Sequence, residues 1–228
     1  MNTGPSAILV HGAFASARSW DKVASILRAK GLKVVEVDNP LTSLADDIAA
    51  TKAALAAQAG PVVLVGHSWG GVVIGEAGDD PKVKALVFVA AFGLDKGESI
   101  TSVSANTAPP PGIKALRPDA SGRLTVDPTA FPKVFASGVP RDEALQMARD
   151  QVPTSASIFD AKAEVAAWRL KPTYYQVSAA DEMIPPAAEA FFAKRMGATT
   201  ITLQTGHASI VSDPHSVAKL ILLAVDRN

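Results

Sequence analysis

One pentapeptide in this sequence could supply a covalent nucleophile. The letters GHSWG at residues 66–70 match the pattern G-x-S-x-G, in which a serine is exposed on a sharp turn. The apolar run 62–65 precedes the turn, and a helical pattern follows from Gly71. This is the strand, turn and helix that the motif requires, whereas an ordinary glycine turn is the alternative. The context favours Ser68 as a nucleophile.

A serine hydroxyl attacks only after a base removes its proton, and the four histidines are the candidates for that base. His207 stands in a loop just after an apolar run that predicts the last strand, where catalytic groups of open α/β sheets gather. His67 is adjacent to the serine on the turn, where consecutive side chains diverge. His11 ends the first strand, and His215 lies in the first turn of the last helix and is expected to be solvated. We therefore predict His207 as the base.

The imidazole needs a carboxylate on its other nitrogen, which holds the tautomer and stabilises the imidazolium. Asp181 comes just after the predicted strand 173–177. Glu182 is its neighbour and Asp95 follows the fourth strand, so both remain candidates, and each could equally be a solvated loop charge. The chain order nucleophile, acid, histidine is the order described for such a site, and it favours Asp181.

Attack on a carbonyl places negative charge on its oxygen, which backbone N–H donors must meet. The amide of Trp69, directly after the nucleophile, is one predicted donor. The second is expected from the loop after the first strand, where Gly12 lets the backbone turn and leaves the N–H of Ala13 or of Phe14 to point inward. A plain turn that ends the strand is the alternative.

The elements that must position these residues alternate along the chain. Short β-branched runs alternate with Ala-rich stretches of helical spacing, a pattern that predicts an α/β fold with helices over a parallel sheet. Ser43 stands where an N-cap would, and Gly31 where the first helix would stop. Six strands are expected at 7–10, 33–37, 62–65, 84–90, 173–177 and 199–203. Helices are expected at about 19–30, 44–59, 69–77, 141–150, 155–168, 186–196 and 214–225.

The alternation is interrupted between residues 93 and about 171. This segment contains three consecutive prolines, 109–111, which favour a stiff loop, and several further Pro and Gly residues. We interpret it as an excursion from the sheet, inserted between the fourth and fifth strands.

Composition limits the partners. The chain has 228 residues, of which 48% are hydrophobic, enough for one domain with a large core. Its 22 Lys and Arg balance 22 Asp and Glu, so no basic field attracts nucleic acid or an anionic membrane surface. The longest apolar stretch, 85–92, is too short to cross a bilayer, and residues 1–5 do not resemble a secretory signal. We expect a cytoplasmic protein.

The same survey argues against a cofactor. With no cysteine, the chain cannot form a disulfide, a thiolate metal site or a cysteine nucleophile. Neither the H-E-x-x-H motif nor the phosphate-binding motif G-x-x-x-x-G-K-[ST] occurs. We predict that no metal and no cofactor take part.

Four segments together carry a family resemblance: VHGAFASARSW, LVGHSWGG, SAADEMIPP and TGHASIVSDP. On them the chain resembles an α/β-hydrolase over nearly its whole length, and within that superfamily the small esterase and hydroxynitrile-lyase branch. The resemblance implies an α/β-hydrolase fold with a core of residues 1–93 and 172–228. It also implies a small helical cap, 94–171, over Ser68.

The branch contains esterases, pyrethroid-type hydrolases, lactonases and carbon–carbon lyases. Its lyases carry a lysine after the histidine, where this chain has Ala208, which argues against cyanohydrin cleavage. We therefore expect a serine hydrolase that cleaves carboxylic esters of small, moderately hydrophobic molecules. The alternatives are a lactonase, a carbon–carbon bond hydrolase or lyase with the same triad, and a receptor-like module that binds a ligand.

Aromatic and sulfur-containing side chains could form an apolar pocket for the acyl or alcohol group. More simply, such residues could attach the cap to the sheet. The candidate pocket residues are Phe14, Trp69, Phe131, Phe135, Met147, Phe159 and Trp168. We expect a small-molecule ester as the partner and a monomer or homodimer as the functional unit.

Overall fold

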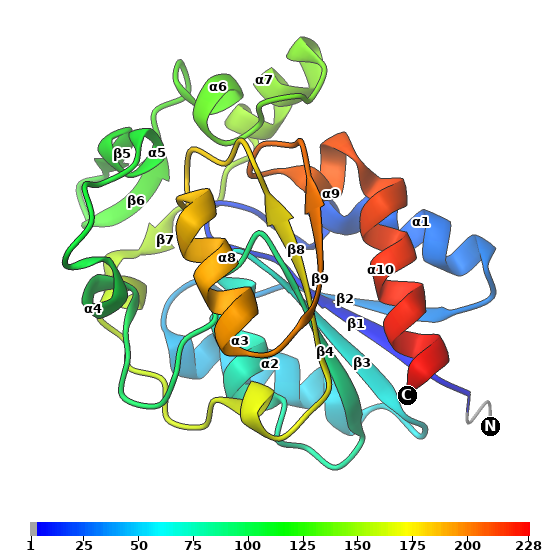
Figure 1. The fold of residues 1–228 in the computed structure, drawn as a ribbon. Coiled ribbons are helices and arrows are strands. Elements are labelled where there is room, and N and C mark those ends of the chain that lie inside the picture. Colours follow the sequence, from blue (N-terminus) through cyan, green and yellow to red (C-terminus); the bar gives the residue numbers. More distant parts are fainter. Residues whose placement is uncertain (1–3) are drawn as a thin grey trace.

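The computed structural model describes residues 4–228, which form a parallel sheet covered by helices (Figure 1). All adjacent strands pair in parallel, in the order β2-β1-β3-β4-β8-β9. The strands are β1 (Ser6–Val10), β2 (Lys33–Val37), β3 (Val62–His67), β4 (Val83–Val89), β8 (Thr173–Ser178) and β9 (Thr199–Leu203). The predicted six-stranded sheet is confirmed.

Helices cover both faces of this sheet. Figure 1 shows α1 and α10 on one face and α2, α3 and α8 on the other. Their bounds, with two short neighbouring helices, are η1 (Ala17–Trp20), α1 (Asp21–Ala29), α2 (Leu44–Ala56), α3 (Gly70–Ala77), α8 (Pro186–Arg195), α9 (Ser209–Ser212) and α10 (Pro214–Arg227). The N-cap predicted at Ser43 is present, since its hydroxyl accepts the amide hydrogen of Asp46 at 3.1 Å.

The inner strands are buried on both faces. Every residue of β1, β3 and β8 is buried, as is every residue of β4 except Lys84. Strands buried in this way pack helices on both sides. Beyond the buried strands β3 and β8, the loops at their carboxyl ends therefore hold the first positions at which a reactive side chain can face solvent or a cavity.

Residues between β4 and β8 leave the sheet and form a separate group of short elements near its carboxyl edge (Figure 1). Three strands make a small antiparallel sheet, β5-β6-β7, which the sequence pattern did not indicate. The elements are α4 (Ile100–Ser104), α5 (Pro111–Lys114), β5 (Leu116–Pro118), β6 (Arg123–Val126), α6 (Phe131–Val134), α7 (Arg141–Arg149), β7 (Thr154–Ser155), η2 (Ala156–Phe159) and η3 (Ala167–Arg169).

The expectation of a helix over 155–168 is wrong. Only two turns of 3₁₀-helix form there, η2 and η3. Between them the amides of Glu164 and Val165 donate to the carboxylate of Glu76 on α3, at 2.9 and 3.1 Å. Ala166 then takes a left-handed conformation, with φ of 53°, which a continuous right-handed helix excludes. Contacts with α3 therefore replace the local helical hydrogen bonds.

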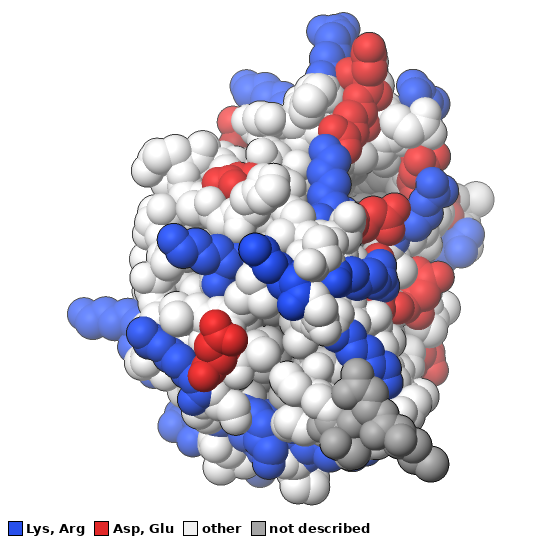
Figure 2. Space-filling view, turned by 90° about the vertical axis from the view of Figure 1, so that its right-hand side faces the viewer, with Lys and Arg blue, Asp and Glu red and all other residues white. Residues whose placement is uncertain are grey.

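The surface carries both signs of charge. Figure 2 shows acidic and basic side chains side by side on the face that includes α1 and α10. Within residues 4–228, no helix is both long and apolar enough to cross a membrane.

Candidate active site

The turn after β3 holds Ser68 in a strained backbone conformation. Its φ is 55°, a left-handed value that costs a non-glycine residue about 1–2 kcal/mol. The turn needs glycine on both sides. A Cβ at position 66 would lie 2.4 Å from the carbonyl oxygen of Gly70, and one at position 70 would lie 2.3 Å from that of Val10. The close packing of β3, α3 and β1 therefore aims the Ser68 hydroxyl away from the sheet.

Three side chains from separate segments meet at this turn in a hydrogen-bonded row. His207, in the loop after β9, places its Nε2 2.9 Å from Oγ of Ser68. Its Nδ1 lies 2.6 Å from Oδ2 of Asp181, which follows β8. The other carboxylate oxygen, Oδ1, accepts the amide hydrogens of Met183 and Ile184 at 2.6 and 2.9 Å. The structure thus brings together the three residues that the sequence singled out.

The environment of Asp181 favours its charged form. The side chain is fully buried, and burial alone would raise its pKa. Opposing this, the His207 imidazole and the hydrogen bonds from the backbone lower the pKa, and the net pKa is below its ordinary value. Asp181 is therefore a carboxylate at neutral pH.

The two other acidic candidates do not contact His207. The Asp95 carboxylate binds the guanidinium of Arg169, which lowers the pKa of Asp95 to about 2. Oε2 of Glu182 is buried and has no hydrogen-bond partner within residues 4–228. The geometry therefore favours Asp181 over both alternatives.

The loop after β1 supplies backbone amides beside the serine. A Cβ at position 12 would lie 2.7 Å from Cβ of Ser68, so Gly12 allows this approach. The N–H of Phe14 is already engaged, because it donates to Oγ1 of Thr154 at 2.9 Å. In the described part of the chain, the N–H groups of Ala13 and Trp69 have no acceptor. The geometry therefore supports Ala13 and Trp69, and argues against Phe14, as the oxyanion donors.

His67 is hydrogen-bonded to the backbone of His207, a contact that the sequence did not indicate. Its Nε2 donates to the backbone carbonyl oxygen of His207 at 2.8 Å, and the two rings lie 4.8 Å apart. Complete burial, with a smaller contribution from the neighbouring His207, lowers the pKa of His67 to about 3. A neutral His67 thus supports the loop that carries His207. Because the two residues are 140 positions apart, no local pattern could reveal this contact.

The two remaining histidines lie outside the row. His11 is buried, and its Nε2 accepts the amide hydrogen of Asn39 at 2.9 Å while Nδ1 donates to the carbonyl of Gly12 at 2.8 Å. His11 therefore holds the loop after β1 in place. His215 is exposed, as expected.

A small cavity of about 30 Å³ adjoins Ser68, and a larger one of about 340 Å³ lies next to it. The predicted residues Phe14, Trp69 and Phe159 line the small cavity. Six side chains line both cavities, and five of them, all except Phe159, were not predicted because they come from short helices and loops far apart in the sequence: Phe92, Ile100, Ile113, Phe159, Met183 and Ile184. Apolar groups therefore surround the space beside the serine.

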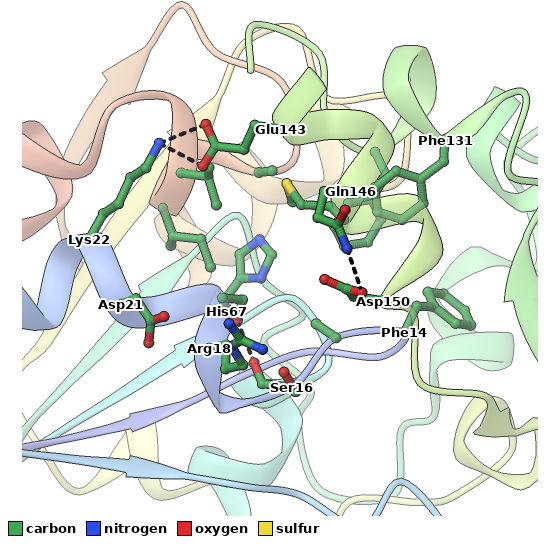
Figure 3. Close-up of a pocket in the computed structure, with 17 residues that line it drawn as sticks. Phe14, Ser16, Arg18, Asp21, Lys22, His67, Phe131, Glu143, Gln146 and Asp150 are labelled. Atoms are coloured by element: carbon green, nitrogen blue, oxygen red, sulfur yellow. Dashed lines mark hydrogen bonds and ion pairs between the residues drawn. The ribbon is translucent and has the colours of Figure 1, made fainter. Parts of the chain in front are cut away.

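A third cavity, of about 320 Å³, lies on the side of His67 (Figure 3). The predicted residues Phe14, Phe131, Phe135 and Met147 line it. An ion pair between Lys22 on α1 and Glu143 on α7, 2.8 Å long, joins the core to the inserted segment beside this cavity.

Trp168 is not a pocket residue, contrary to the prediction. It lines none of these cavities; its indole N–H donates to the carbonyl of Leu94 at 2.8 Å, and the Arg169 guanidinium lies 4.7 Å from its ring centre. The indole of Trp69 also points into the core, where it donates to Asp47 at 2.8 Å. Trp168 therefore serves packing, whereas Trp69 packs in the core and also lines the small cavity.

Within residues 4–228, no group of three or more His, Asp or Glu side chains is arranged to hold a metal ion. The parallel sheet and the hydrogen-bonded row of Ser68, His207 and Asp181 are typical of α/β-hydrolases. The chain belongs to the alpha/beta hydrolase family, whose model matches residues 7–220.

Sequence relatives agree with this class. The alpha/beta hydrolase nvfD of Aspergillus novofumigatus is 27% identical over 95% of each chain. A carbendazim hydrolyzing esterase of a Nocardioides species is 28% identical over 45% of this chain and 48% of its own.

Solved structures show the same fold. A pyrethroid hydrolase from Sphingobium faniae superposes with a TM-score of 0.82 at 22% identity, over 97% of this chain and 98% of its own. Polyneuridine aldehyde esterase superposes with a TM-score of 0.81, at 20% identity over 96% and 98% of the two chains. The predicted membership of the α/β-hydrolase superfamily is confirmed.

Proposed function

We propose that this protein is a serine hydrolase that cleaves carboxylic esters of small, moderately hydrophobic molecules through an acyl-enzyme. One observation carries the proposal. Nε2 of His207 lies 2.9 Å from Oγ of Ser68, while Nδ1 lies 2.6 Å from Asp181. This is the arrangement in which an imidazole takes a proton from a serine while a carboxylate stabilises the resulting imidazolium.

The proposed reaction has two halves. Ser68 attacks the ester carbonyl while His207 accepts its proton, and the amides of Ala13 and Trp69 stabilise the oxyanion. The intermediate collapses as His207 returns the proton to the departing alcohol. Water, deprotonated by His207, then attacks the acyl-enzyme, and His207 gives that proton to Oγ of Ser68 as the acid is released.

The surroundings support a neutral, apolar substrate. The cavities next to Ser68 are lined by Phe, Ile, Met and Pro side chains, with Ser and Thr as the polar members and no charged residue. A buried charge without a partner is costly, so these walls disfavour an ionised acyl group. A sequence relative named as an esterase supports ester hydrolysis.

The test is hydrolysis of a series of p-nitrophenyl esters of increasing acyl length, beside a series of lactones, by wild type and by Ser68→Ala. The variant should lose about 10⁶-fold in kcat, and a fluorophosphonate should label wild type only. Ser121→Ala, on the exposed turn between β5 and β6, is the matched control and should retain full activity.

Two results would contradict the proposal. Turnover retained in purified Ser68→Ala would exclude the serine as the nucleophile. Wild type that turns over lactones far faster than open-chain esters would exclude the proposed substrate class.

A further inference from the structure

The loop that carries the proposed oxyanion donor Ala13 contains a strained residue. Phe14, next to Ala13, has a φ of 65°, a left-handed value that a bulky side chain rarely adopts. Its side chain is buried. A conformation of this kind persists only where surrounding groups fix it. Because the two residues are neighbours in the chain, the groups that hold Phe14 also restrict the position of Ala13.

The groups that hold Phe14 belong to the segment inserted between β4 and β8. The N–H of Phe14 donates to Oγ1 of Thr154 on β7 at 2.9 Å. Its carbonyl oxygen accepts the N–H of Val152 at 3.1 Å, in an isolated antiparallel bridge. Both polar groups of the Phe14 backbone are therefore bonded to residues about 140 positions away, so the inserted segment fixes the strained loop.

The hydroxyl of Thr154 is fully used in this arrangement. Thr154 is completely buried, and its hydroxyl donates to the carbonyl of Val152 at 3.2 Å. A hydroxyl has one hydrogen to donate, so a lone pair of Oγ1 remains to accept the N–H of Phe14. Without this oxygen, the N–H of Phe14 would be buried with no acceptor, and the loop would gain by moving.

The neighbouring residue connects the same strand to the other proposed oxyanion donor. The N–H of Ser155 donates to the carbonyl of Leu41 at 2.9 Å, and the N–H of Leu41 donates to Oδ1 of Asp47 at 2.8 Å. Oδ2 of Asp47 accepts the indole N–H of Trp69 at 2.8 Å. Strand β7 is thus linked by hydrogen bonds to the surroundings of both proposed donors.

We propose that Thr154 is a positioning residue for the oxyanion hole. Its hydroxyl holds the N–H of Phe14 away from the substrate and fixes the loop so that the N–H of Ala13 faces the oxyanion. Thr154 lines none of the three cavities, and so it acts through the loop and not by contact with the substrate. The proposal rests on the proposed function, because it concerns the same site.

The experiment compares Thr154→Val with Thr154→Ser in the hydrolysis of p-nitrophenyl esters. Valine keeps the shape but loses the oxygen, and its kcat should fall about 10- to 100-fold with KM nearly unchanged, somewhat less than for removal of an oxyanion donor. Serine keeps the hydroxyl, so its kcat should stay within about 3-fold of wild type. Equal kcat values of the two variants would overturn the proposal.

Thr125→Val is the matched control, because it makes the same chemical change within the same small sheet. Thr125 on β6 pairs with Arg117 on β5 and lines none of the three cavities. Its variant should retain kcat within about 2-fold. A loss as large as that of Thr154→Val would contradict the proposal. Absence of all wild-type turnover would instead contradict the proposed function.

An inhibitor pair separates positioning of the oxyanion donors from general damage to the pocket. Oγ of Ser68 adds to the carbonyl carbon of an alkyl trifluoromethyl ketone, its proton passes to His207, and the carbonyl oxygen becomes an oxyanion. The matching secondary alcohol forms no oxyanion. In Thr154→Val, the Ki of the ketone should rise by the factor by which kcat/KM falls, whereas the Ki of the alcohol should stay within about 3-fold. Equal rises for both inhibitors would overturn the proposal.

Hydrogen–deuterium exchange tests the hydrogen bond itself and needs no turnover. The Phe14 amide should exchange about tenfold faster in Thr154→Val than in wild type, as for loss of one buried hydrogen bond, with the amide of Leu9 on β1 as the internal reference. Thr154→Ser should exchange at the wild-type rate. An unchanged ratio of Phe14 to Leu9 exchange in Thr154→Val would show that the hydroxyl does not hold the loop, and the proposal would be wrong.

Discussion

Replacing Asp181 by asparagine should invert the hydrogen-bonding pattern of His207 without changing its shape. In the structure, Oδ1 of Asp181 accepts two backbone amides, which fixes that oxygen in place. An asparagine that keeps these bonds must turn its NH₂ group toward Nδ1 of His207. Because that NH₂ group donates, Nδ1 must become the unprotonated acceptor, and the ring proton moves to Nε2. Nε2 then faces Ser68 with a proton already bound, and it cannot accept the proton of the serine.

The magnitude follows from this tautomer change. Loss of the correct tautomer in a Ser-His-Asp site costs about 10⁴-fold in kcat. At about 1.36 kcal/mol per tenfold change in rate, the barrier rises by about 5.4 kcal/mol. KM should change little, since Asp181 lines neither cavity beside Ser68.

The assay is steady-state hydrolysis of p-nitrophenyl acetate by wild type, Asp181→Asn and Asp95→Asn, with circular dichroism to establish folding. Asp95 is the matched control because its carboxylate binds Arg169 rather than His207, and its variant should retain kcat within about 2-fold. Asp181→Asn with kcat within tenfold of wild type would refute the reasoning. So would Asp95→Asn that loses as much activity as Asp181→Asn.

Two further predictions concern stability. Gly70→Ala should lower the free energy of unfolding by about 3 kcal/mol, because its Cβ would lie 2.3 Å from the carbonyl oxygen of Val10. Gly75→Ala lies in the same helix with no neighbouring atom within 4 Å of the added Cβ, and it should instead raise the free energy of unfolding by about 0.5–1 kcal/mol. Equal unfolding free energies of the two variants in urea would contradict this. The pKa of His67 is lowered to about 3. Below pH 6.5 its imidazole therefore binds a proton in the unfolded chain but not in the folded chain. The free energy of unfolding should therefore decrease as the pH falls from 6.5 toward 3. Between pH 6.5 and 5, wild type should lose about 2 kcal/mol more of it than His67→Gln, whose amide can still donate to the carbonyl of His207. Parallel curves of unfolding free energy against pH would contradict this.

The sequence alone determined the architecture of the sheet and the chemistry at its edge. Strands and helices were predictable because burial on one or two faces imposes a periodicity that adjacent residues display. The serine was predictable because the turn requires glycines at fixed positions around it. Ser68 and His207 were therefore identifiable without coordinates. Asp181 was identifiable with them through the order of nucleophile, acid and histidine along the chain.

The tertiary structure decided which groups touch. Asp95 and Asp181 both follow strands, yet only Asp181 contacts His207, whereas Asp95 pairs with Arg169. The sequence suggested Trp168 as a pocket residue, but its indole N–H donates to the carbonyl of Leu94 and its side chain lines none of the cavities. The helix expected over 155–168 is replaced by contacts with Glu76, 88 residues away in the chain from Glu164.

The contacts that support the site were likewise decided by the tertiary structure. His67 supports the loop of His207 from 140 positions away. A periodicity reports which face of an element is buried, but not which partner lies there. That partner is set by the packing of whole elements against one another, and so the environment of each charge emerges only when the chain is folded.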